Sequence, residues 1–251
     1  MGFQARFLIF LYAALTVLSV FLTYLLCLSF GHVTSILPYL SFLGDKPLES
    51  TLFTQLFVID AAVLMLLVQV RFVQAFRYLN KQNASDRMFA VNYAAVCVGH
   101  SAAVGLFVMA CFQESHAFWV HQLAGILLYF FGSVIYFVLQ TVVSSGTASV
   151  PRDKVLVNLR VVISVFLIIF YVCFEVGYLL AMKLHDKPWD KRNEWSKEDD
   201  GWIFYILSSI SEWLLLLLFQ LYFLTFYFDF KNVVLMKTRI VVSFENENAG
   251  H

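Results

Sequence analysis

The sequence has little charge and no excess of either sign. Only 14% of its 251 residues are Asp, Glu, Lys or Arg, whereas 61% are hydrophobic; soluble domains carry roughly 25% charged residues. A soluble chain of this length leaves a large surface in water, so this composition excludes a soluble globular domain and favours a lipid bilayer as the solvent. The formal net charge of zero gives no reason to expect nucleic acid as a partner.

The motifs of common catalytic and metal sites are also missing. The histidines show neither HxxxH nor HExxH spacing, so a zinc site is not expected. There is no GxSxG segment, which argues against a serine hydrolase. The four cysteines lack CxxC spacing and fall in or beside apolar segments, where thiols pack as small apolar groups. We therefore expect no enzyme activity, no catalytic residue, no metal and no cofactor.

Long apolar segments are abundant, and six of them reach the roughly 20 residues that a helix needs to span a bilayer. They cover about 7–30, 52–76, 89–112, 119–143, 159–183 and 203–228. Strict two-residue alternation is absent, which argues against a membrane barrel. The expected fold is all-α: a polytopic membrane protein with one six-helix transmembrane domain over 1–251, ending in a short tail, 229–251.

The distribution of Lys and Arg predicts the orientation, because cytosolic flanks carry the excess of positive charge. With both termini cytosolic, that side carries eleven of these residues and the other side six. The cytosolic set is Arg6, Arg71, Arg77, Lys81, Arg87, Arg152, Lys154, Arg160, Lys231, Lys237 and Arg239. We expect both termini in the cytosol and the sequon at Asn83 to be unglycosylated.

Three carboxylates and one histidine lie inside the apolar spans. Asp60, Glu175 and Glu212 fall at similar heights on the predicted luminal half of their helices, and His100 lies near the centre of the third span. A charge at the bilayer centre costs about 2.5–3.5 kcal/mol, so these groups are expected to face the interior as one polar layer. Two roles stay open: hydrogen bonds that fix helix packing, or a ligand, proton or ion site.

The first loop, about 31–51, is predicted to be ordered and to lie on the luminal side. Its prolines fix the backbone, and Gly-Asp is a turn signal. Its apolar run "ILPYLSFL" favours packing over the luminal mouth of the bundle, as a lid or as a plain structural cap. The candidate lid residues are His32, Pro38, Tyr39, Gly44, Asp45 and Glu49.

The tail after the last span alternates basic and apolar residues. Lys231, Lys237 and Arg239 are candidates for contact with the anionic cytosolic leaflet, although lipid-binding clusters usually have four to eight basic residues. The alternative is the ordinary positive flank of a final transmembrane helix.

Several stretches resemble the DRAM family, the damage-regulated autophagy modulators, within the wider Frag/DRAM/Sfk group of six-helix proteins. They are "GHVTSILPYLSFLGDKPLES" in the first loop, "FQE" followed by His121, "SVIYFVLQTVVS", "LRVVIS", "SSISEW" and "FLTFYFDF". The first loop departs from the family pattern, because Phe42 stands where the family has aspartate and Leu48 where it has proline.

The resemblance implies a multipass membrane regulator of the autophagy–lysosome pathway, in the lysosomal, late endosomal or plasma membrane. It implies membrane lipids and unidentified proteins as partners and leaves the oligomeric state open. Two alternatives remain: a transporter or lipid-handling protein that uses the carboxylate layer, and a plasma-membrane adaptor in phosphoinositide metabolism. Related branches of the group act in GPI-anchor remodelling and in phosphoinositide kinase recruitment.

Overall fold

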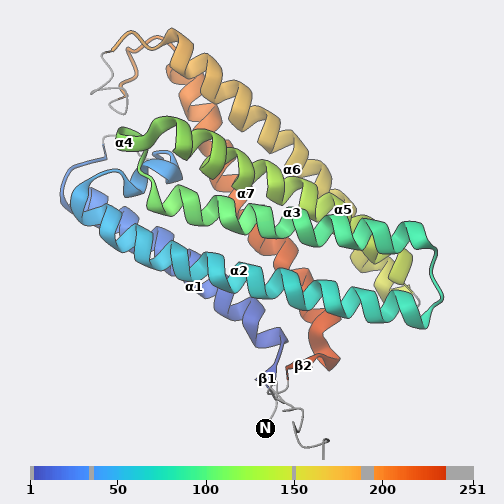
Figure 1. Cartoon of the computed structure of the whole chain (residues 1–251). Helices are drawn as coiled ribbons and strands as arrows, with labels where there is room; N and C mark the ends of the chain where they lie inside the picture. The colour runs from blue at the N-terminus through green and yellow to red at the C-terminus, as the bar shows by residue number, and fades with distance from the viewer. Residues whose placement is uncertain (1–2, 34–36, 149–150, 188–194, 236–251) are drawn as a thin grey trace, which may run out of the picture.

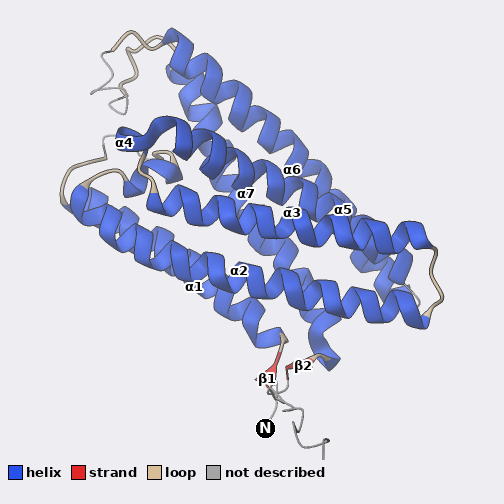
Figure 2. Ribbon diagram, viewed as in Figure 1, coloured by secondary structure: helices blue, strands red, loops and turns tan. Residues whose placement is uncertain are grey.

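The computed structural model describes residues 3–33, 37–148, 151–187 and 195–235, and within them it is almost entirely helical (Figures 1 and 2). The elements are β1 (Phe3–Gln4), α1 (Arg6–Ser29), η1 (Leu40–Gly44), α2 (Pro47–Lys81), α3 (Asp86–Cys111), α4 (Glu114–Trp119), η2 (Val120–Phe131), α5 (Gly132–Thr147), α6 (Pro151–Leu184), α7 (Trp202–Asp229), η4 (Phe230–Asn232) and β2 (Val234–Leu235). Because α4, η2 and α5 continue as one rod, the described chain has six helical rods long and apolar enough to cross a membrane. The all-α, six-span prediction is confirmed.

Two of these rods extend well beyond the predicted apolar segments. The second helix begins at Pro47 and ends at Lys81, whereas the apolar segment covers only about 52–76. Proline suits the first helical position, because the amide hydrogen that it lacks would have no partner there. The fifth rod, α6, likewise begins at Pro151 rather than near 159. Hydropathy finds the part of a helix that lipid contacts, while the helical hydrogen bonds continue into polar flanks.

The fourth rod contains a feature that the apolar pattern did not predict. Residues Val120–Phe131 form the π-helix η2, a conformation that is rare and often occurs at functional sites. This segment lies against the backbone of α3. A Cβ at Gly105 would lie 2.4 Å from the backbone nitrogen of Tyr129, and one at Gly125 would lie 2.9 Å from the Cα of Met109. Glycine at both positions therefore allows the two backbones to pack directly against each other.

The helices pack as neighbours around a core of aromatic and aliphatic side chains. The third helix contacts α2, η2 and α5; α6 lies along α7; and α1 contacts both α2 and α7. One end of the bundle carries the first loop, the turn before α4 and the α6–α7 loop, and we call it the loop-1 end (Figure 1).

The opposite end, which we call the termini end, carries β1, β2 and the α2–α3 turn (Figure 2). There the two short strands pair in an antiparallel manner, and the amide of Ala5 donates to the carbonyl of Val233 at 2.9 Å. Lys231, in η4, is exposed at this end. The other two predicted tail contacts, Lys237 and Arg239, lie outside the described residues.

Candidate functional site

The carboxylate of Glu212 anchors the first loop inside the bundle. Its side chain is fully buried. It accepts hydrogen bonds from the backbone amides of Leu40, at 2.7 Å, and of Ser41, at 3.4 Å. These amides belong to the first turn of η1. Amides in the first turn of a helix have no partner within the helix and form a natural site for a carboxylate.

Neighbouring side chains hold the same loop along its length. The hydroxyl of Ser209 donates to the carbonyl of Leu37, and the indole nitrogen of Trp213 donates to the carbonyl of Pro38 at 2.9 Å. The thiol of Cys27 lies 3.4 Å from the carbonyl of Leu43. Residues 37–46, which we call the loop-1 plug, are thus bonded to α1 and α7 by their backbone.

The ring of Tyr39 inserts into an aromatic cage. It makes edge contacts with Tyr178 at 5.6 Å and Tyr205 at 5.1 Å between ring centroids. Edge-to-face pairs at these distances are favourable beyond the area they bury. Tyr205 in turn stacks on Trp195 at 4.5 Å, so the aromatic contacts continue into the α6–α7 loop. Burial raises the pKa of the Tyr39 hydroxyl above its usual range, and the group is therefore neutral.

The remaining lid candidates hold the plug to neighbouring helices. The imidazole of His32 is hydrogen-bonded to the carboxylate of Glu49, whose side chain is fully buried. The carboxylate of Asp45 accepts a hydrogen bond from the amide of Ser115 at 2.9 Å. A Cβ on Gly44 would lie 2.6 Å from the ring of Phe53. All six candidates thus lie in or beside the plug, which is packed into the bundle rather than laid across its mouth.

The structure does not show the predicted single polar layer of Asp60, Glu175, Glu212 and His100. In the described part of the chain no hydrogen bond or ion pair joins any two of them. Asp60 is fully buried but accepts a hydrogen bond from Thr16 at 2.6 Å. The other two are only partly buried: His100 bonds a carbonyl of its own helix, and Glu175 contacts Tyr171.

The reason is that height along a helix does not determine which way a side chain points. Spacing along each span placed the four groups at comparable depths, but the rotation of each helix turns them toward different hydrogen-bond partners. The space beside Glu212 is correspondingly small. A cavity of about 10 Å³ lies there, lined in part by Tyr129 and Phe130, which is at the lower limit of what one water needs.

Another buried carboxylate at this end was not among the candidates. Glu114 is 1% exposed and accepts hydrogen bonds from Gln122 at 3.1 Å and from the Tyr178 hydroxyl at 3.2 Å. It lies just after the third span rather than inside it, so the search for charges within apolar segments passed over it. Its bonds connect the start of α4 with η2 and with α6, near the plug.

The α6–α7 loop has its own ion pair, formed by Lys187 and Asp199 with 2.6 Å between nitrogen and oxygen. The same carboxylate accepts a hydrogen bond from the amide of Ser196 at 2.7 Å. Partial burial raises the pKa of the Asp199 carboxyl, but these two donors outweigh it and hold the pKa below its usual value.

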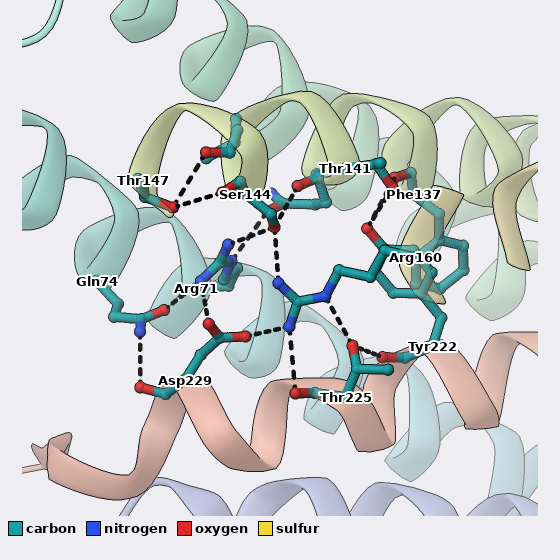
Figure 3. A network of polar contacts seen from close by, with 12 residues as sticks. Arg71, Gln74, Phe137, Thr141, Ser144, Thr147, Arg160, Tyr222, Thr225 and Asp229 are labelled. Atoms are coloured by element: carbon teal, nitrogen blue, oxygen red, sulfur yellow. Dashed lines mark hydrogen bonds and ion pairs between the residues drawn. The ribbon is translucent and has the colours of Figure 1, made fainter. Parts of the chain in front are cut away.

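The termini end contains a second polar cluster, built around two buried arginines (Figure 3). Arg71 of α2 is 2% exposed and Arg160 of α6 is 1% exposed. Asp229, the last residue of α7, pairs with both: it forms an ion pair with Arg160, and its other oxygen lies 3.7 Å from Arg71. Gln74 donates to the carbonyl of Asp229 at 2.7 Å. We call these residues, with Ser144, the arginine cluster.

The fifth helical segment, α5, supplies the acceptor that joins the two guanidinium groups. The hydroxyl oxygen of Ser144 accepts from Arg71 at 3.1 Å and from Arg160 at 2.8 Å. The ring of Phe226 contacts both groups, with centroid distances of 4.9 and 5.0 Å to their central carbons. Cation–π contacts at such distances are attractive, most of all where water is excluded. Four helices, α2, α5, α6 and α7, thus meet in one network.

The arginine cluster is not predicted from the sequence, because both arginines are counted there as ordinary positive flanks of their spans. The position of the arginines along their helices is the signal that could have predicted it. Arg71 and Arg160 lie about 14–15 Å along their helices from the ends at Lys81 and Pro151, at 1.5 Å per residue. Positive flanks usually lie at the ends of spans, so arginines this far inside a helix require internal partners.

A groove with apolar walls lies between α1 and α7, which are in contact elsewhere along their length. Its volume is about 430 Å³, and it is lined mainly by apolar side chains, among them the strongly exposed Val17 and Leu217. Gln220 lines this groove and is 7% exposed, and both polar atoms of its amide are buried and have no hydrogen-bond partner. An unsatisfied amide is costly in hydrocarbon, so a ligand with a hydrogen-bonding oxygen is favoured there.

Comparison with known proteins assigns the family. The sequence profile described as the Frag1/DRAM/Sfk1/Cwh43P N-terminal domain matches residues 4–233, which includes every helix that the structure describes. The chain belongs to this family. Within it, the DRAM resemblance noted in the sequence is confirmed by similarity to individual DRAM proteins.

Curated DRAM proteins from several vertebrates are similar to this chain over most of their length. DNA damage-regulated autophagy modulator protein 1 of Xenopus laevis is 28% identical over 84% of this chain and 84% of its own. The human protein 1 is 28% identical over 85% of this chain and 86% of its own. Protein 2 of Rattus norvegicus is 27% identical over 85% of this chain and 79% of its own. No solved structure matches the chain.

The stretches that carry the DRAM resemblance also carry both polar clusters. "SSISEW" contains Ser209, Glu212 and Trp213, the three α7 side chains that bond the loop-1 plug. "SVIYFVLQTVVS", "LRVVIS" and "FLTFYFDF" supply Ser144, Arg160 and Asp229 respectively. The DRAM-like segments therefore supply part of both clusters, while Arg71 and Gln74 of the arginine cluster come from α2, outside these stretches.

Proposed function

We propose that this chain is a multipass membrane regulator of the autophagy–lysosome pathway that acts without catalysis, through membrane lipids and protein partners. The observation that carries the proposal is the similarity over most of its length to proteins named DNA damage-regulated autophagy modulators. We further propose the lysosomal or late endosomal membrane as its location, with the plasma membrane as the alternative, and both termini in the cytosol.

The geometry of the loop-1 end supports a regulator over a carrier. A carrier that uses Glu212 needs a passage to it, and the plug fills that space except for a cavity of about 10 Å³. The carboxylate instead bonds two backbone amides of the plug. Residues 38–41 of the plug are buried, so this loop closes the bundle instead of lining a path for a cargo.

The test is a measurement of autophagic flux in cells with and without the gene. Flux is read as the lysosome-dependent loss of an autophagosome-bound reporter, with and without inhibition of lysosomal acidification. We expect lower flux after deletion and recovery with the unmodified chain. Glu212→Gln, which keeps one acceptor oxygen for the plug, should also restore flux, since a regulator does not need the acid. Unchanged flux after both deletion and overexpression would refute the proposal.

Lipid handling is the second candidate function, and the groove between α1 and α7 favours it. An acyl chain or a ring system fits its apolar walls, and a lipid oxygen that reached the buried amide of Gln220 would give its N–H groups an acceptor. Labelling with a photoactivatable lipid in cells tests this. We expect crosslinks within α1 and α7, and their reduction in Gln220→Leu. Labelling spread evenly over all six spans would count against a specific groove.

A further inference from the structure

We propose that the arginine cluster binds a phosphate-type oxyanion, in the first place the headgroup of an anionic phospholipid, in the cavity beside it. This site is independent of the autophagy role and of the loop-1 end. Four observations carry it: the charge balance, the unused donors, the adjoining cavity and its level in the bundle.

The cluster has more positive than negative charge in a region that excludes water. Arg71 and Arg160 are almost completely buried, and Asp229 is the carboxylate that both of them face. Guanidinium groups stay protonated, so the three groups together carry one positive charge. An excess buried charge is costly unless it is paired. The ring of Phe226 compensates part of it, and an anion would compensate the rest.

The guanidinium groups also have donors to spare. Each has five N–H groups. Arg160 uses four of them, on Thr225 (two bonds), Ser144 and Asp229, which leaves one on Nη1. Arg71 bonds Gln140, Gln74 and Ser144, which leaves one on Nη1, the nitrogen that faces Asp229, and one on Nη2. Nη1 of Arg160 and Nη2 of Arg71 both bond the Ser144 hydroxyl, so an unused N–H group of each arginine flanks the same oxygen.

A cavity lies where an anion would have to bind. It has a volume of about 190 Å³, and both arginines line it together with Ser144, Lys231 and Asn232. Its wall also includes the carboxylates of Asp153 and Asp229 and the exposed ring of Tyr78. Three cationic side chains against two carboxylates leave the wall with one net positive charge. Arginine donors aligned on a phosphate form short, strong, charge-assisted bonds.

The level of the cavity matches that of lipid headgroups. Asp229 is the last residue of α7, and Lys231 follows it in η4. The cavity therefore opens where this span leaves the bilayer. The positive-inside count predicts that this is the cytosolic side, where anionic phospholipids are enriched.

The experiment uses the full chain, purified and reconstituted, with two probes. The lipid arm measures retention of dioleoyl phosphatidic acid against dioleoyl phosphatidylcholine by native mass spectrometry. The soluble arm measures stabilisation by inorganic phosphate in detergent. We expect phosphatidic acid to be retained over phosphatidylcholine and to be displaced by phosphate. Saturable binding of phosphate without retention of phosphatidic acid would assign the site to a free anion instead. Equal retention of the two lipids together with no effect of phosphate would overturn the proposal.

Two variants leave both arginines in place. Leu156→Trp fills the cavity from its α6 wall, and Lys231→Gln removes an exposed cation from its rim. Each should weaken phosphatidic acid binding by about tenfold, Lys231→Gln because one charge-assisted contact is lost and Leu156→Trp because less space is left for the headgroup. The matched controls are Leu184→Trp and Lys183→Gln, both exposed at the other end of α6, and they should bind like the unmodified chain.

If Leu156→Trp prevents folding, Lys231→Gln alone tests the site, because the side chain of Lys231 is exposed and its replacement should not disturb the core. Binding that is unchanged in Lys231→Gln and in a folded Leu156→Trp would show that the anion does not occupy this cavity. Equal weakening in the controls would overturn the site as well, since it would indicate a general surface effect.

Discussion

Replacement of Glu212 by alanine should release the loop-1 plug. The carboxylate is the acceptor for two buried backbone amides, at 2.7 Å from Leu40 and 3.4 Å from Ser41. Leaving a buried donor without a partner costs about 1–3 kcal/mol. The longer contact is the weaker one, so we expect a total loss of about 2–4 kcal/mol of docking free energy. At a factor of ten per 1.4 kcal/mol, the undocked population should rise about 30- to 700-fold.

The thiol of Cys27 reports this opening directly. It is 3% exposed in the docked state, and its sulfur lies 3.4 Å from the Leu43 carbonyl. A maleimide reagent should therefore label it only when the plug leaves. The measurement is made in a background where the other three cysteines are replaced by alanine, so that every modified molecule reports the same site. When opening is fast relative to labelling, the rate is proportional to the undocked population.

Two variants make the test decisive. Glu212→Gln keeps one acceptor oxygen and should label at an intermediate rate. Glu175→Gln changes a carboxyl that contacts Tyr171 rather than the plug and should label like the unmodified chain. If Cys27 is labelled equally slowly in Glu212→Ala, while the variant is folded by circular dichroism, the anchoring role of Glu212 is wrong.

Three further perturbations test other parts of the structure. Asp229→Asn removes the carboxylate that pairs with two buried arginines, and it should lower the free energy of unfolding by about 3 kcal/mol, or the Tm by about 6–12 °C for a chain of this size. An unchanged Tm in detergent would show that other groups compensate the charge of the arginines. Gly105→Ala places a methyl group 2.4 Å from a backbone nitrogen of η2 and should cost about 1–3 kcal/mol by overpacking, whereas Gly132→Ala, with its nearest contact at 3.3 Å, should cost less in the same thermal scan. The pKa of Asp199 is lowered in the folded state, so the ionised carboxylate stabilises the α6–α7 loop above the unfolded pKa, and this stabilisation is lost as the pH falls through the folded pKa, below about pH 4. Hydrogen exchange in this loop, corrected for the intrinsic rate, should therefore accelerate below that pH. Asp199→Asn should remove this pH dependence.

The six-span membrane fold could be predicted from the sequence because hydrophobicity is a local property of each segment. Each span is a run of apolar residues long enough to cross a bilayer, and helix is the form that satisfies its backbone there. Six such runs were found and all six are helical rods. Their ends were less predictable, as Pro47 shows, since helical hydrogen bonding continues beyond the apolar run. The π-helical geometry of Val120–Phe131 depends on contact with α3 and had no counterpart in the apolar pattern.

The partners of the polar residues were decided by tertiary structure. Sequence spacing gave the depth of Glu212 and Asp60 but not the rotation of their helices, and the two carboxylates bond a loop amide and a threonine instead of each other. Two complete spans separate Arg71 from Arg160 in the sequence, yet the two arginines share the hydroxyl of Ser144 and the carboxylate of Asp229. Hydrophobicity is a property of each segment and can be read locally, whereas a hydrogen bond between distant segments exists only once the helices have packed.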